Sequence, residues 1–100
     1  MGLPMNIQYL GFEQRLNRRT YAFRVIETLK PDREFQLSVD MHSLTANKFK
    51  LQDIPDLCFA KLKRDLGAET LGEAVPLRRR LSDFDLQQYI ASHYQKEKRA

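Results

Sequence analysis

The chain of 100 residues has few cysteines, glycines and histidines, and each shortage excludes a class of site. The single cysteine, Cys58, excludes an internal disulfide and fits a reducing compartment, for which we expect the cytoplasm. The four glycines are scattered, so the sequence contains no glycine-rich loop that would cradle a phosphate. Two histidines and one cysteine without ligand spacing form no zinc motif, and we expect neither a metal nor another cofactor.

Long apolar runs are missing as well. No segment approaches the length of a membrane span, and MGLPMNIQYLGF lacks the basic start and cleavage site of a secretory signal. We therefore expect no membrane partner. Hydrophobic residues make up 42% of the chain and charged residues 30%, which is enough for one modest core. We expect a single small globular domain over residues 1–100.

The first half of the chain predicts β-strands. Residues 19–29 (RTYAFRVIETL) are rich in aromatic and β-branched side chains, and residues 34–42 (EFQLSVDMH) alternate between apolar and polar positions. An earlier strand within residues 6–16 and a short piece at 49–51 are expected to join the same sheet. Residues 75–81 (VPLRRRL) predict an edge strand. Pro76 has no backbone N–H to donate to a neighbouring strand, so proline in a sheet is usually confined to its edge.

The apolar positions of the two main strands all have odd numbers. Residues that oppose each other on one face must then have numbers with an even sum. With the turn signal KPDR between the strands, we expect the numbers of opposed residues to add up to 64. That register pairs Leu29 with Phe35 and sets Arg24 against Asp40 on the outer face.

The second half of the chain predicts two helices. The first is expected over residues 54–66, with Asp53 as its N-cap. The second follows a capping box of Ser82 and Asp85 and extends to about residue 97. The apolar stripe of the first helix comprises Pro55, Cys58, Phe59, Leu62 and Leu66. The stripe of the second comprises Leu86, Tyr89, Ile90, His93 and Tyr94.

These elements predict an α+β fold: a small antiparallel sheet of three to five strands, one face packed by a helix, with a C-terminal amphipathic helix. We expect the core to bury Phe23, Val25, Phe35, Leu37, Val39, Cys58, Leu62 and Leu66 together. The C-terminal stripe is wide and aromatic, so we expect it to provide an interface for a second copy or a protein partner.

Two groups of arginines are the candidate binding residues, in a chain of formal net charge +4. They are Arg15, Arg18 and Arg19, and Arg78, Arg79 and Arg80. The triplet at 78–80 has three interpretations: phosphate recognition, a kinase site at Ser82 in RRLS, or a solvated strand edge. If the segment is extended, Arg79 shares the apolar side and its two neighbours point outward. Whether both groups form one patch depends on the fold.

The expected function is that of a non-catalytic domain. It acts by protein–protein interaction or self-association, with nucleic-acid binding through the two arginine groups as the alternative. A thiol-dependent enzyme based on Cys58 is a third class, which no local sequence supports.

Overall fold

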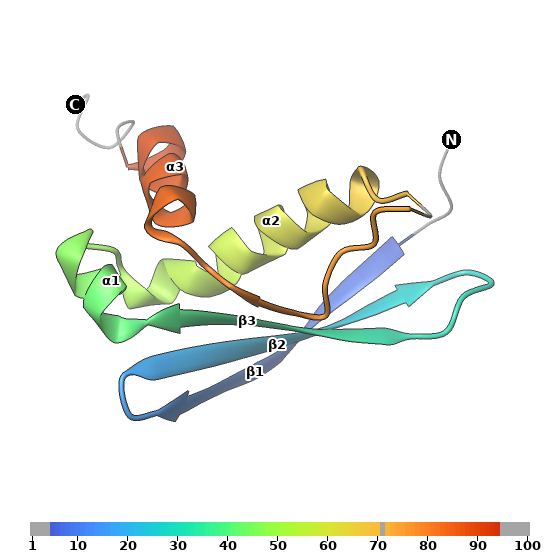
Figure 1. Cartoon of the computed structure of the whole chain (residues 1–100), viewed down its shortest axis with the longest axis horizontal. Helices are drawn as coiled ribbons and strands as arrows, with labels where there is room; N and C mark the ends of the chain where they lie inside the picture. Colours follow the sequence, from blue (N-terminus) through green and yellow to red (C-terminus); the bar gives the residue numbers. More distant parts are fainter. Residues whose placement is uncertain (1–4, 71, 95–100) are drawn as a thin grey trace.

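The computed structural model describes residues 5–70 and 72–94 as an α+β domain in which the helices lie to one side of a four-stranded sheet (Figure 1). In chain order the elements are β1 (Met5–Arg15), β2 (Arg18–Glu27), β3 (Arg33–Asp40), α1 (Met41–Ala46), the 3₁₀ turn η1 (Leu51–Asp53), α2 (Ile54–Gly67), β4 (Arg78–Arg80) and α3 (Asp83–His93). The fold class is the predicted one. None of the helices in these residues is long and apolar enough to cross a membrane.

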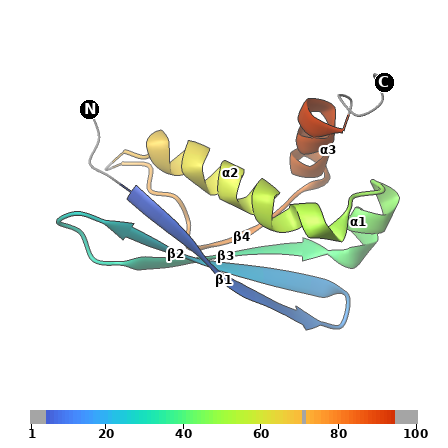
Figure 2. The ribbon, with the colours of Figure 1, turned by 180° about the vertical axis from the view of Figure 1, so that it is seen from behind.

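The sheet has the strand order β1-β2-β3-β4. The first two pairings are antiparallel, as expected, but β4 runs parallel to β3, so the sheet is mixed. A parallel neighbour needs a long crossover, and α1 and α2 provide it on one side of the sheet. The other side stays uncovered (Figure 2).

The register of the β2–β3 hairpin differs from the predicted one. Phe23 opposes Phe35, and Arg18 opposes Asp40, so opposed numbers sum to 58. The even sum is confirmed, whereas the pairing of Arg24 with Asp40 is wrong. Leu29 explains the difference, because it has φ 67 and belongs to the turn that follows β2.

The core lies between the sheet and α2, and all eight residues predicted for it are buried. The stripe of α2 is rotated from the predicted one, however. Ile54 and Leu57 are buried, and Phe59 is 39% exposed. The predicted strand at 49–51 is also wrong. Phe49 packs against the rings of Tyr89 and Tyr94, at 5.4 and 5.7 Å between centroids, so its apolar side chain helps α3 to dock.

The capping box at the start of α3 is present. The Asp85 backbone N–H donates to Ser82 Oγ at 3.2 Å, and the Ser82 N–H donates to the Asp85 carboxylate at 2.9 Å. The helix is described to His93, and the end predicted near residue 97 lies outside the described residues.

Candidate functional site

The parallel pairing of β4 with β3 brings the two arginine groups together. Ser38 in the middle of the sheet opposes Arg80 on one side and Thr20 on the other. Tyr21, Phe23 and Val25 of β2 and Phe35, Leu37 and Val39 of β3 are buried on the side of α2, so the even-numbered residues of both strands point to the uncovered face. Arg18, Arg78 and Arg80 therefore share this face, although 60 residues of chain separate the first from the second.

Glu69 holds the segment that leads into β4. Its carboxylate accepts two hydrogen bonds from Arg33, at 2.9 and 3.1 Å, and one from the Val75 backbone N–H at 2.7 Å. The hydrogen bond from Arg33 holds the pKa of Glu69 below its usual value. Two backbone bonds then flank β4: Gln36 N–H to Leu77 O at 2.8 Å, and Leu81 N–H to Ser38 O at 2.7 Å. A surface loop thus places the arginines beside β3.

The shared face carries a shallow groove of about 320 Å³. Its lining consists of Arg18, Thr20, Gln36, Ser38, Arg78, Arg79 and Arg80. Two further hollows continue it. The hollow at the β1–β2 turn shares Arg18 and Thr20 with the groove, and the hollow over β1 shares Thr20 and Gln36. Together they form a track across the sheet, which we call the arginine face.

The arginine face has a surplus of positive charge. The outward positions of the four strands hold five arginines (Arg15, Arg18, Arg24, Arg78 and Arg80) and three carboxylates (Glu13, Glu34 and Asp40). Arg18 lies 3.3 Å from Asp40, and Arg15 lies 3.8 Å from Glu13. Neither Arg78 nor Arg80 has an ion pair or side-chain hydrogen bond within the described ranges. Both are exposed and free to meet an anion.

Arg19 does not belong to this face. It points to the helix side of the sheet, where its guanidinium carbon lies 4.3 Å from the centroid of the Phe12 ring. It donates to Gln14 Oε1 at 2.7 Å and to the Tyr21 hydroxyl at 3.3 Å. Its Nε and Nη1 donate within the chain, so Arg19 lies apart from Arg18, Arg78 and Arg80, and the fold does not bring all six candidate arginines to one face.

Arg79 also points toward the helices, as the alternation predicted. Its Nη1 donates to Asp65 Oδ2 of α2 at 2.6 Å, whereas its Nε and Nη2 are buried without a hydrogen-bond partner. Burial opposes the ionisation of Asp65, but the bond from Arg79 and the charge of Lys61 outweigh it and hold its pKa below the usual value. Arg79 therefore joins β4 to α2 with its side chain, although it also lines the groove.

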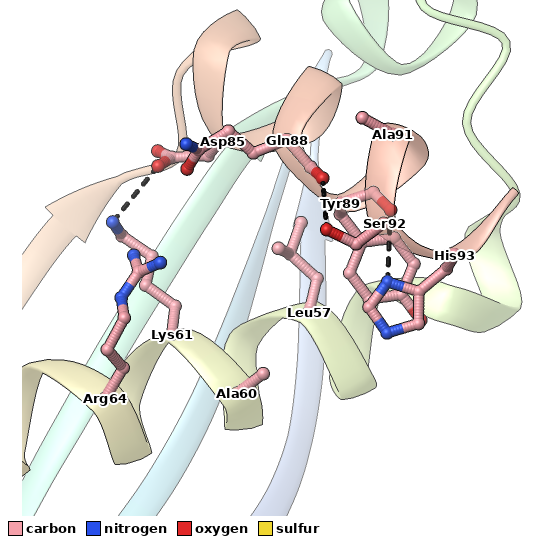
Figure 3. Close-up of a pocket in the computed structure, with 10 residues that line it drawn as sticks. All are labelled: Leu57, Ala60, Lys61, Arg64, Asp85, Gln88, Tyr89, Ala91, Ser92 and His93. Atoms are coloured by element: carbon pink, nitrogen blue, oxygen red, sulfur yellow. Dashed lines mark hydrogen bonds and ion pairs between the residues drawn. The ribbon is translucent and has the colours of Figure 1, made fainter. Parts of the chain in front are cut away.

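A second cavity, of about 430 Å³, lies between α2 and α3 (Figure 3). Its polar groups are bonded to one another: Lys61 Nζ lies 3.1 Å from Asp85 Oδ1, and Ser92 Oγ donates to the Gln88 carbonyl at 3.0 Å. His93 stacks on the Tyr89 ring at 3.9 Å between centroids, and its Nδ1 is 3.1 Å from the Tyr89 carbonyl. The hydroxyl of Ser92 thus faces a carbonyl and not a base, so the cavity lacks a paired nucleophile.

The C-terminal stripe packs largely on its own domain. Leu86 and Tyr89 are buried, while Ile90 and Tyr94 are partly buried against the core. The Tyr89 hydroxyl donates to Asp56 at 2.7 Å; burial and this bond raise its pKa above the usual value. His93 is exposed and not interior. The surplus apolar area expected on this helix is therefore small, and an interface through it stays a prediction.

Cys58 and Ser82 have structural positions. Cys58 is fully buried, and desolvation raises the pKa of its thiol to about 12, so a reactive thiolate does not form in the native fold. Ser82 caps α3, and of the two arginines in RRLS that a kinase would recognise, Arg79 is paired with Asp65. Within residues 5–70 and 72–94, no three His, Cys, Asp or Glu side chains gather as metal ligands.

The residues that complete the groove, Thr20, Gln36 and Ser38, were not predicted from the sequence. The pattern that could have indicated them is their position on the polar side of two strands with alternating apolar and polar residues. The comparisons add no relative: no family model matches the chain, and neither a curated protein nor a solved structure does.

Proposed function

We propose that this chain is a non-catalytic domain that binds the phosphate backbone of nucleic acid on its arginine face. The observation that carries the proposal is the convergence of Arg18, Arg78 and Arg80 on one groove from two distant segments. Guanidinium groups match phosphate oxygens in geometry and stay charged at every physiological pH. Hydroxyl and amide side chains such as Thr20 and Gln36 are further common donors to phosphate.

The lining of the groove favours nucleic acid over a protein partner. Protein interfaces are usually anchored by large aromatic or aliphatic side chains at their centre. Here the centre is formed by Thr20, Ser38 and Gln36 between arginines. A track of polar donors with surplus positive charge is instead typical of contacts to a phosphate backbone. The single cysteine also fits the reducing cytoplasm, which is where we expect this domain to act.

The position of the aromatic rings favours backbone contacts over base stacking. Tyr9, Phe12, Tyr21, Phe23 and Phe35 all lie on the helix side of the sheet. Single-strand binders of the common kind stack bases on rings that face the ligand. No aromatic ring lines the groove at Arg18, Arg78 and Arg80, so we expect binding with little sequence preference.

A salt titration tests the proposal. Affinity for a fluorescent duplex oligonucleotide is measured by anisotropy at increasing salt, for the wild type and for the double variant Arg78→Ala, Arg80→Ala. Each lost phosphate contact lowers the log–log salt slope by nearly one, so the double variant should lose about two. Arg64→Ala is the matched control, because Arg64 is exposed on α2 and does not line the groove. Absence of binding, or equal slopes for the two arginine variants, would contradict the proposal.

A further inference from the structure

β1 forms one edge of the sheet, and the three-residue strand β4 forms the other. The 11-residue strand β1 pairs with β2 on one side and with no other strand in the described chain. An edge strand presents unpaired N–H and C=O groups to which another strand can add, and proteins usually protect such edges with charges, prolines or bulges. From Met5 to Phe12 the strand has no charged residue and no proline, and it carries a single irregularity between Tyr9 and Gly11.

Aromatic side chains are exposed along this edge. Tyr9 is 45% exposed and Phe12 is 52% exposed. Their rings lie against buried rings of β2, with centroids 5.2 Å apart for Tyr9 and Phe23 and 5.4 Å apart for Phe12 and Tyr21. The apolar side of the sheet therefore continues from the core to the rim of β1. A partner that lies beside β1 would cover both rings.

The bulge makes the strand complementary to a second copy of itself. Because of the shift at Gly11, Tyr9 and Phe12 lie on the same face, although one number is odd and the other even. In an antiparallel pair of β1 strands, Tyr9 can then oppose Phe12 of the second copy. The same register sets Ile7 against Gln14 on the helix side.

On the outer side, this register pairs Gln8 with Glu13 and Asn6 with Arg15. No like charges face each other, and the centre of the pair is uncharged. Leu10 meets Gly11 of the second copy, and a glycine at this point, with φ 122, leaves room for the leucine. The strand thus fits its own sequence without a clash of charge or bulk.

We propose that two copies of this chain associate through antiparallel pairing of their β1 strands, so that two four-stranded sheets become one continuous sheet. This inference is independent of nucleic-acid binding. It also places the expected self-association at β1 and not at α3, whose stripe is largely packed within the chain.

Sedimentation equilibrium at micromolar concentration tests the proposal. The wild type should sediment as a dimer, and Phe12→Glu should weaken the dimer at least about tenfold, because it places a charge in the seam. Phe84→Glu is the matched control: Phe84 is 64% exposed on the first turn of α3, so the same substitution there should leave the dimer intact. Circular dichroism checks that each variant is folded.

Hydrogen exchange gives a second readout that needs no variant. The backbone amides of Met5–Arg15 that face away from β2 should be protected at high protein concentration and should exchange faster on dilution. A wild type that stays monomeric would overturn the proposal. A dimer that survives Phe12→Glu would overturn it as well. The same holds for a dimer that Ile90→Asp dissociates, if the exchange rate of the β1 amides does not change with protein concentration.

Discussion

The ion pair between Arg79 and Asp65 should respond unequally to the removal of its two partners. The side chain of Arg79 is 18% exposed and that of Asp65 is 25% exposed, with 2.6 Å between Nη1 and Oδ2. Asp65 has two other cations nearby, Lys61 Nζ at 3.8 Å and Arg64 Nε at 3.5 Å. Among the described residues, Arg79 pairs with Asp65 alone, and its Nε and Nη2 are buried without a partner.

Asp65→Ala should therefore destabilise the fold more than Arg79→Met does. Breaking a fully buried pair costs about 3–5 kcal/mol, and the partial exposure here reduces the expected loss for Asp65→Ala to roughly 2–3 kcal/mol. Arg79→Met removes the two unpaired donors together with the charge and keeps the apolar volume, so we expect a loss of about 1 kcal/mol or less. The methionine leaves Asp65 with its two neighbouring cations.

Urea unfolding followed by circular dichroism measures both losses, and the double variant completes the cycle. The pH dependence is an internal check. The pKa of Asp65 is lowered from 3.8 in the folded chain, so its stabilisation is complete above that value and is lost as pH falls through the folded-state pKa. The advantage of wild type over Asp65→Ala should be the same at all pH values well above 3.8 and should shrink as the pH falls below 3.8. An Arg79→Met loss equal to or larger than that of Asp65→Ala would refute the argument.

Three further predictions concern the core and the start of α3. Leu62→Ala should lower the free energy of unfolding by about 2–5 kcal/mol, because Leu62 is fully buried; a loss under about 0.5 kcal/mol in urea unfolding would mean that α2 packs differently. Ser82→Ala should cost about 1 kcal/mol through the lost N-cap, whereas Ser92→Ala on the same helix should cost less by the same assay. Cys58 should react with a thiol reagent only at the rate of unfolding, and rapid labelling of the native chain would contradict its burial.

Local sequence patterns predicted the parts of the fold that depend on neighbouring residues. Alternation identified the buried faces of β2 and β3, and the spacing of Ser82 and Asp85 identified the start of α3. The hairpin register was wrong because it depends on where the turn begins. Leu29 is apolar and was placed in the strand, but its positive φ puts it in the turn, and side-chain hydrophobicity carries no signal for that.

The arginine face shows the same division between local and distant information. The outward direction of Arg78 and Arg80 follows from alternation within one strand. Their place beside Ser38 follows from a parallel pairing across a long crossover, together with the hydrogen bond that the Val75 N–H donates to Glu69. Contacts between residues so far apart in the chain depend on tertiary packing, which periodicity cannot supply. The role of Arg19 was missed for this reason as well, since Phe12 lies on another strand.

The two proposals together predict how a dimer would meet nucleic acid. Antiparallel pairing of two β1 strands has a twofold axis perpendicular to the sheet, so both arginine faces lie on the same side. From β4 of one copy to β4 of the other is about seven strand spacings, or roughly 34 Å in a flat sheet at about 4.8 Å each. One turn of duplex DNA is also about 34 Å long.

Phe12→Glu should then weaken binding to a duplex of two turns, although Phe12 lies on the opposite side of the sheet from Arg78 and Arg80. A duplex shorter than one turn can engage only one groove and should bind both proteins equally. Equal loss on both duplexes, measured by anisotropy at one salt concentration, would show that the variant acts on the groove itself and not through the dimer.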